Sequence, residues 1–201
     1  MNPNDRIAGI RRRLAKGQTA AFAATAPANV VYLTGFDDVF DAGRDHIALV
    51  TADECVLITN ALYAQAAREA AEAGGDVWRV EVAVRGEAWS TVASALPSEA
   101  VLAVEDSMPH ASFLKVSGVF AERVSAVSDW GEELRAVKSP AELKRMELAQ
   151  EITDRGFVFI CGYLRPGVTE REIAIELESF MRREGSEGVA FPSIVASGPN
   201  S

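Results

Sequence analysis

The sequence changes character near Trp130, and this change constrains the possible folds more than any other feature. Before it, short apolar runs with strand-like alternation are interleaved with helical patterns. After it, Ser139-Pro140-Ala141-Glu142 opens a helix with a hydroxyl N-cap, proline at the first helical position and a glutamate three residues on. We therefore predict one domain over residues 1–130 and a second, different segment over residues 131–201.

The first segment predicts an α/β domain with a mixed sheet. Its strand-like runs cover residues 19–23, 46–51, 55–59, 77–82, 101–105 and 123–127. Helical patterns cover residues 5–16, 27–33, 61–73, 87–96 and 109–116. Only the three-residue turn 52–54 separates two of the runs, which favours an antiparallel hairpin there. Helices interleaved with the other strands give the α/β class.

The second segment predicts two amphipathic helices and one strand. Apolar residues recur at three- and four-residue spacing from Leu143 to Tyr163, which predicts one helix of about 25 residues. Pro166-Gly167 ends that helix, and Thr169 with Glu172 forms the capping box of the next. Phe191–Ala196 is an apolar, partly β-branched run and is typical of a strand.

A lone strand is physically unsatisfactory, because its backbone donors and acceptors have no partners. Either Phe191–Ala196 joins the sheet of the first domain, or its partner strands lie outside this sequence, and we expect the second. The apolar stripes of both helices also lack a sheet to cover. We expect them to pack on the first domain, to pair with a second copy of the chain, or to stay mobile. The stripes comprise Leu143, Met146, Ile160, Ile173, Leu177 and Phe180.

Composition excludes several classes of protein. The formal net charge of −9 argues against a nucleic-acid groove, which needs a basic face. No apolar run approaches the roughly 18 residues of a membrane span, and no signal peptide follows the polar start. Cys55 and Cys161 lie far apart in apolar segments, and we expect buried free thiols in a reducing compartment. We predict a cytoplasmic protein that binds neither nucleic acid nor membrane.

Most catalytic signatures are absent. The sequence has no glycine-rich phosphate loop, no H-E-x-x-H and no C-x-x-C. His46 and His110 are too few for a histidine-rich zinc site, and we expect both to be structural or on the surface. The acidic loop Asp37-Asp38-Val39-Phe40-Asp41 offers oxygens for a hard cation, but we interpret it as a solvated turn.

Four stretches, in order along nearly the whole chain, carry a resemblance. Asn29-Val-Val-Tyr-Leu-Thr-Gly-Phe36 resembles the N-x-x-Y-L-T-G-F signature in the N-terminal domain of the Xaa-Pro aminopeptidase, prolidase and creatinase family. Glu133–Leu143 is similar to that family's domain junction, and Leu164–Ala174 to its first turn between helices. Phe191–Ser201 is similar to its first catalytic-domain strand.

The resemblance implies a creatinase/prolidase-like α/β domain followed by the beginning of an α+β "pita-bread" catalytic domain. In the peptidase branches that domain binds two divalent metal ions (Mn, Co or Zn) through two aspartates, a histidine and two glutamates. All of these ligands, and a further catalytic histidine, would lie beyond Ser201. We therefore assign no catalytic and no metal-binding residue in this chain. The resemblance implies a homodimeric metallopeptidase for peptides with proline at the second position, and we expect this chain alone to be inactive.

One residue is a candidate for substrate binding. Gly43-Arg44 is similar to a Gly-Arg pair that binds a substrate carboxylate in the creatinase branch, reaching into the neighbouring subunit of the dimer. Arginine suits this role because its planar fork pairs with both carboxylate oxygens. An ordinary surface arginine remains the alternative. Two other functions also remain open: a creatinase-like C–N hydrolase, which works without metal, and a non-catalytic protein-binding or dimerisation module.

Overall fold

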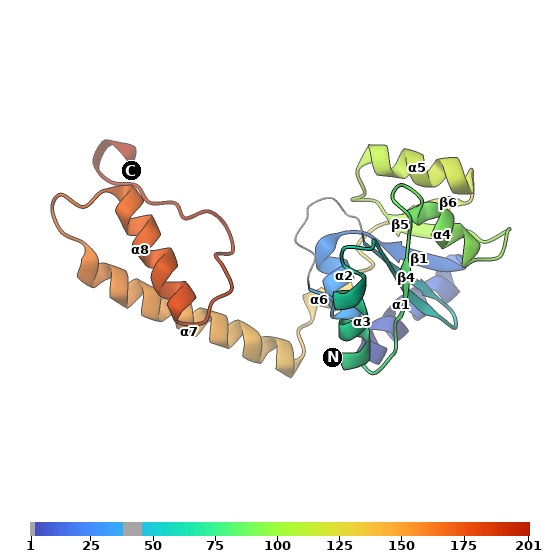
Figure 1. Ribbon diagram of the computed structural model, residues 1–201, viewed down its shortest axis with the longest axis horizontal. Coiled ribbons are helices and arrows are strands. Elements are labelled where there is room, and N and C mark those ends of the chain that lie inside the picture. The colour runs from blue at the N-terminus through green and yellow to red at the C-terminus, as the bar shows by residue number, and fades with distance from the viewer. Residues whose placement is uncertain (1–2, 38–45) are drawn as a thin grey trace. The chain divides into compact units, whose positions relative to one another are not determined.

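The computed structural model describes residues 3–37 and 46–201. The chain divides into two compact units, Met1–Val137 and Lys138–Ser201. The helices and strands up to α6 belong to the first unit, and α7 and α8 belong to the second (Figure 1).

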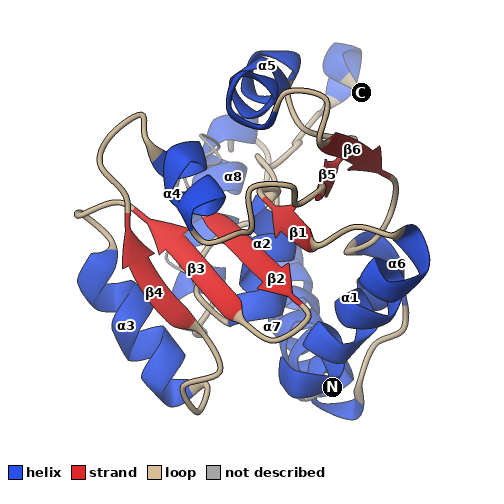
Figure 2. Cartoon of the chain, turned by 90° about the vertical axis from the view of Figure 1, so that its right-hand side faces the viewer, coloured by secondary structure: helices blue, strands red, loops and turns tan. Residues whose placement is uncertain are grey.

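Six strands of the first unit form one mixed sheet in the order β4-β3-β2-β1-β5-β6 (Figure 2). The central strand β1 pairs antiparallel with β2 and parallel with β5, so the sheet is mixed as the sequence predicts. The turn at 52–54 joins β2 to β3 as the predicted antiparallel hairpin. The strands are β1 (Ala21–Ala24), β2 (Ile47–Thr51), β3 (Cys55–Thr59), β4 (Arg79–Val82), β5 (Leu102–Glu105) and β6 (Val124–Val127).

Helices cover both faces of this sheet, and strand alternation divides the core between them. Phe22 and Ala24 of β1 enter the apolar cluster under α1, α2 and α3, whereas Ala21 and Ala23 enter the cluster under α4 and α5. Both clusters are buried, as a sheet covered on two sides requires. The helices are α1 (Pro3–Gly17), α2 (Pro27–Thr34), α3 (Ala64–Ala73), α4 (Ala88–Ser94) and α5 (His110–Phe120).

The first unit extends past the expected boundary at residue 130. The Trp130 indole lies against the Phe22 ring, with the ring centroids 5.3 Å apart. The next helix, α6 (Glu132–Ala136), places Leu134 so close to α1 that a Cβ on Gly9 would lie 2.6 Å from its Cδ2 atom. Apolar packing therefore ties this linker to the first unit up to Val137.

The second unit contains α7 (Pro140–Tyr163) and α8 (Glu170–Arg183). Both predicted capping boxes are present, at Ser139 with Glu142 and at Thr169 with Glu172. The two helices approach closely at Gly156, where a Cβ would lie 3.2 Å from a Leu177 methyl carbon. Nearby, the rings of Phe159 and Phe180 stack with their centroids 4.4 Å apart.

Phe191–Ala196, whose composition is typical of a strand, has no regular secondary structure, because the described residues place no partner strand beside the run. Ile194 in this run is 89% exposed. The expectation that both cysteines are buried is wrong for Cys161, which is exposed, whereas Cys55 is buried. Of the expected stripes, Leu143 and Met146 are also exposed. None of the described helices has the length and apolar character that a membrane crossing requires.

A pair of truncated chains tests whether the α6 linker belongs to the first unit. We expect residues 1–137 to unfold cooperatively, and residues 1–129 to be less stable by about 3–5 kcal/mol because the Trp130 contact with Phe22 is lost. Urea unfolding followed by circular dichroism measures both. Equal midpoints for the two chains would show that the linker contributes nothing to the first unit.

Candidate functional site

A buried carboxylate caps the helix that carries the N-x-x-Y-L-T-G-F signature. Glu105 closes β5 and is 4% exposed. Its Oε2 atom accepts hydrogen bonds from the backbone N–H groups of Thr25 at 2.8 Å and Ala26 at 2.7 Å. No side chain of α2 caps its own N-terminus. Glu105 therefore satisfies N–H groups at the helix start and places negative charge at the positive end of the helix dipole.

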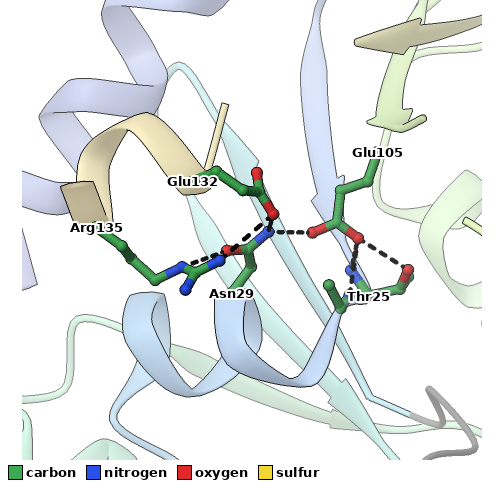
Figure 3. A network of polar contacts seen from close by, with 6 residues as sticks. Thr25, Asn29, Glu105, Glu132 and Arg135 are labelled. Atoms are coloured by element: carbon green, nitrogen blue, oxygen red, sulfur yellow. Dashed lines mark hydrogen bonds and ion pairs between the residues drawn. The ribbon is translucent and has the colours of Figure 1, made fainter. Parts of the chain in front are cut away.

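The side-chain amide of Asn29 joins this carboxylate to the linker helix α6 (Figure 3). Its Nδ2 atom donates to Glu105 Oε1 at 2.7 Å and to Glu132 Oε1 at 2.8 Å. Its Oδ1 atom accepts from Arg135 Nε at 2.9 Å. Asn29 is completely buried, so both N–H groups and the carbonyl oxygen are used where water does not compete.

Gly131 makes this approach possible. A Cβ atom built on Gly131 would lie 2.4 Å from Asn29 Cγ and 2.5 Å from Asn29 Oδ1. Carbon atoms in contact normally stay about 3.5–4.0 Å apart, so any larger residue would push α6 away from α2.

The rest of the signature has structural roles. The Tyr32 hydroxyl donates to the Leu134 carbonyl oxygen at 2.9 Å, a third hydrogen bond between α2 and α6. Thr34 Oγ1 donates to Val30 O and accepts from Phe36 N. Gly35 ends α2 with φ at +75°, a conformation that favours glycine. The signature therefore shapes one helix, its exit and its attachment to the linker.

An aromatic cluster flanks the segment that contains the predicted substrate-binding residue. The rings of Phe36 and His46 meet edge to face with centroids 5.3 Å apart, and Tyr63 packs against His46 at 4.8 Å. His46 Nδ1 lies 2.9 Å from Thr59 Oγ1. Arg44 itself lies outside the described residues, as do Asp38 and Asp41.

The other singled-out residues show no catalytic arrangement. His46 is buried with Thr59 as a hydrogen-bond partner, and His110 is exposed at the first position of α5. Burial raises the pKa of the Cys55 thiol to about 11, against a smaller lowering by Arg11, so the thiol stays protonated at neutral pH. Within residues 3–37 and 46–201, no three His, Cys, Asp or Glu side chains are placed to hold a metal ion.

Sequence reasoning missed Glu105, Glu132 and Arg135. A usable signal existed, since Glu105 ends the apolar strand Leu102–Val104 and Asn29 interrupts an apolar helix. Such polar residues in apolar elements need partners when buried. The sequence alone does not identify the partners of Asn29, because Glu105 and Glu132 lie 76 and 103 positions away along the chain. This network fixes α6, the last helix of the first unit, and its role is structural.

Two family models match the chain in succession. The Creatinase/Prolidase N-terminal domain matches residues 6–137, and metallopeptidase family M24 matches residues 144–201. Similar proteins include an uncharacterized peptidase, YqhT, of Bacillus subtilis, 30% identical over 184 residues, which cover 87% of this chain and 48% of that protein. An Xaa-Pro dipeptidase of Pyrococcus furiosus is 26% identical over 87% of this chain and 47% of its own length.

Solved structures give the same picture. An Xaa-Pro dipeptidase from Bacillus anthracis matches 94% of this chain with a TM-score of 0.81 and 25% identity. An X-Pro aminopeptidase from Thermotoga maritima matches 92% with a TM-score of 0.75 and 30% identity. Each match covers 52% of the solved chain. The chain thus spans about half the length of the relatives that it matches.

A double-mutant cycle tests whether the lack of a side chain at Gly131 allows the close approach of Asn29. We expect Asn29→Ala to destabilise the chain by about 3 kcal/mol, because it removes bonds to charged partners, one of them buried. Gly131→Ala should cost about 1–3 kcal/mol alone but much less beside Asn29→Ala, where the clash is gone. Urea unfolding supplies the four free energies.

Gly118→Ala is the matched control for that cycle, because a Cβ at Gly118 meets nothing within 4 Å. It should be neutral or slightly stabilising in both backgrounds. Strictly additive effects of Asn29→Ala and Gly131→Ala would contradict the close approach.

Proposed function

The chain belongs to the creatinase/prolidase family, and we propose that the whole protein is a metal-dependent peptidase that cleaves peptides with proline at the second position. The observation that carries the proposal is the succession of the creatinase/prolidase N-terminal model over residues 6–137 and the M24 metallopeptidase model over residues 144–201. Relatives that match both units are named Xaa-Pro dipeptidase and Xaa-Pro aminopeptidase.

Such a bond needs a dedicated enzyme. An Xaa-Pro bond is a tertiary amide without an N–H group, and proline restricts the residue before it. A pair of divalent metal ions supplies a hydroxide nucleophile and polarises the carbonyl group when bound. The described residues do not fit such a pair, since no cluster of potential ligands occurs among them. We infer that residues outside the described part of this chain supply the ligands.

We propose that the described residues of this chain contribute structural support. Asn29, itself bonded to Glu105, and Tyr32 hold α6, which leads through Val137 into α7 of the M24-matched unit. The aromatic contact between Phe36 and His46 joins two residues on either side of the segment with Arg44. We propose that Arg44 binds the substrate carboxylate in the active site of a neighbouring subunit of a homodimer, in the cytoplasm.

The assay of the whole protein against this chain tests the function. With Mn, Co or Zn added, we expect the whole protein to hydrolyse Xaa-Pro dipeptides or longer Xaa-Pro peptides, and to lose this activity with a chelator. Xaa-Ala peptides serve as the control substrate. The 201-residue chain should show no metal-dependent turnover.

Other outcomes of that assay identify the competing functions. Chelator-resistant hydrolysis of a C–N bond in creatine would replace the proposal with the creatinase branch. Absence of hydrolysis on every substrate, with a folded protein, would favour a binding or dimerisation module.

Arg44→Ala tests the proposed carboxylate contact in the whole protein. A lost two-bond ion pair is worth about 1.5–3 kcal/mol, so kcat/KM should fall by roughly ten- to hundredfold. The melting temperature should stay nearly constant, and Arg85→Ala, at an exposed turn, is the control. Unchanged kinetics would remove Arg44 from the active site.

A further inference from the structure

One carboxylate at the start of α8 holds the last residues of the chain. Glu170 Oε1 accepts hydrogen bonds from Ser197 N at 2.7 Å and from Ser197 Oγ at 2.9 Å. The same oxygen accepts from Asn200 Nδ2 at 3.1 Å, and Oε2 lies 3.3 Å from that nitrogen. Both ends of the short turn that contains Gly198–Asn200 are thus bonded to a side chain about thirty positions earlier.

These bonds also act on the ionisation of Glu170. The Asn200 side chain, followed by the Ser197 backbone and hydroxyl, holds the pKa of the Glu170 carboxyl below its ordinary value of 4.5. A lowered pKa means that the bonds contribute stability above pH 4.5 and lose it as the pH falls through the folded-state pKa. At neutral pH the carboxylate is charged and can accept all of these hydrogen bonds.

The bonded residue follows the apolar run that has no strand partner. Phe191–Ala196 has no regular secondary structure, although its composition is typical of a strand. Ser197 comes directly after it and has an extended backbone, with φ −142° and ψ 155°. Side chains of a strand alternate between faces, so a shift of one residue reverses which of them face the core. A fixed point at Ser197 sets this register before any partner strand pairs.

We propose that Glu170 is a positioning residue: it pins Ser197 and Asn200, sets the register of Phe191–Ala196, and thereby orders the M24-matched unit. The effect on catalysis rests on the proposed peptidase function, whereas the contact itself does not. The M24 model matches this region, including α8 and residues 197–201. Glu172, in the same helical turn, instead bonds Thr169 in the capping box.

Hydrogen exchange and kinetics on the whole protein test the proposal together. In Glu170→Ala we expect the Ser197 amide to exchange about tenfold faster or more, since a charge-assisted bond protects it. We expect kcat to fall by about ten- to hundredfold with KM within about twofold, because misplacement acts on the reacting geometry. Glu170→Gln loses the charge at the helix start but keeps a carbonyl oxygen, so it should retain more protection and more activity than Glu170→Ala.

Glu178→Ala is the matched control on the same helix, because Glu178 is paired with Arg182 and not with the chain end. It should leave Ser197 exchange and kcat unchanged. Unaltered Ser197 exchange in Glu170→Ala, or equal loss of kcat in Glu178→Ala and Glu170→Ala, would overturn the proposal. If the unmodified protein has no Xaa-Pro activity, the proposed function fails, and the exchange rates alone decide whether Glu170 pins the segment.

Discussion

Both N–H groups and the oxygen of the Asn29 side-chain amide are hydrogen-bonded. The nitrogen donates to Glu105 and Glu132, and the oxygen accepts from Arg135. The first unit depends on this arrangement, because three separate elements meet there: the start of α2, the end of β5 and the linker helix α6. A buried amide that lost one of these partners would keep its cost of desolvation without the compensating bond. The network therefore favours a single position of α6 over any looser one.

That position matters because of what α6 connects. Trp130 and Leu134 pack into the first unit, and a few residues later Ser139 caps α7 of the second. The linker is thus anchored by apolar packing and polar bonds up to Val137, and the second unit starts at once. In the second unit Glu170 fixes Ser197 by the same kind of contact, a carboxylate on backbone and side-chain donors. Glu105 and Glu170 thus both use a carboxylate to bond backbone and side-chain donors.

The sequence was sufficient for the parts of the structure that local physics decides. Short apolar, strand-like runs predicted the six strands, and the pairs Ser139/Glu142 and Thr169/Glu172 predicted both helix starts. It was insufficient where distant residues decide. Phe191–Ala196 has strand composition without a partner, and the role of Asn29 follows only from the fold that brings Glu105 and Glu132 together. The signature itself was visible as a resemblance, but the bonds that its residues make to β5 and α6 were not.

The structure places the Asn29 amide out of contact with water, with both N–H groups and the oxygen hydrogen-bonded. Proton exchange of its side-chain NH₂ group, measured by nitrogen-edited NMR on the labelled chain, tests this directly. We expect two resolved amide protons that exchange far more slowly than those of the exposed Gln150 amide, and that lose this protection in Gly131→Ala. Rapid exchange of both Asn29 protons, at the rate of Gln150, would contradict it.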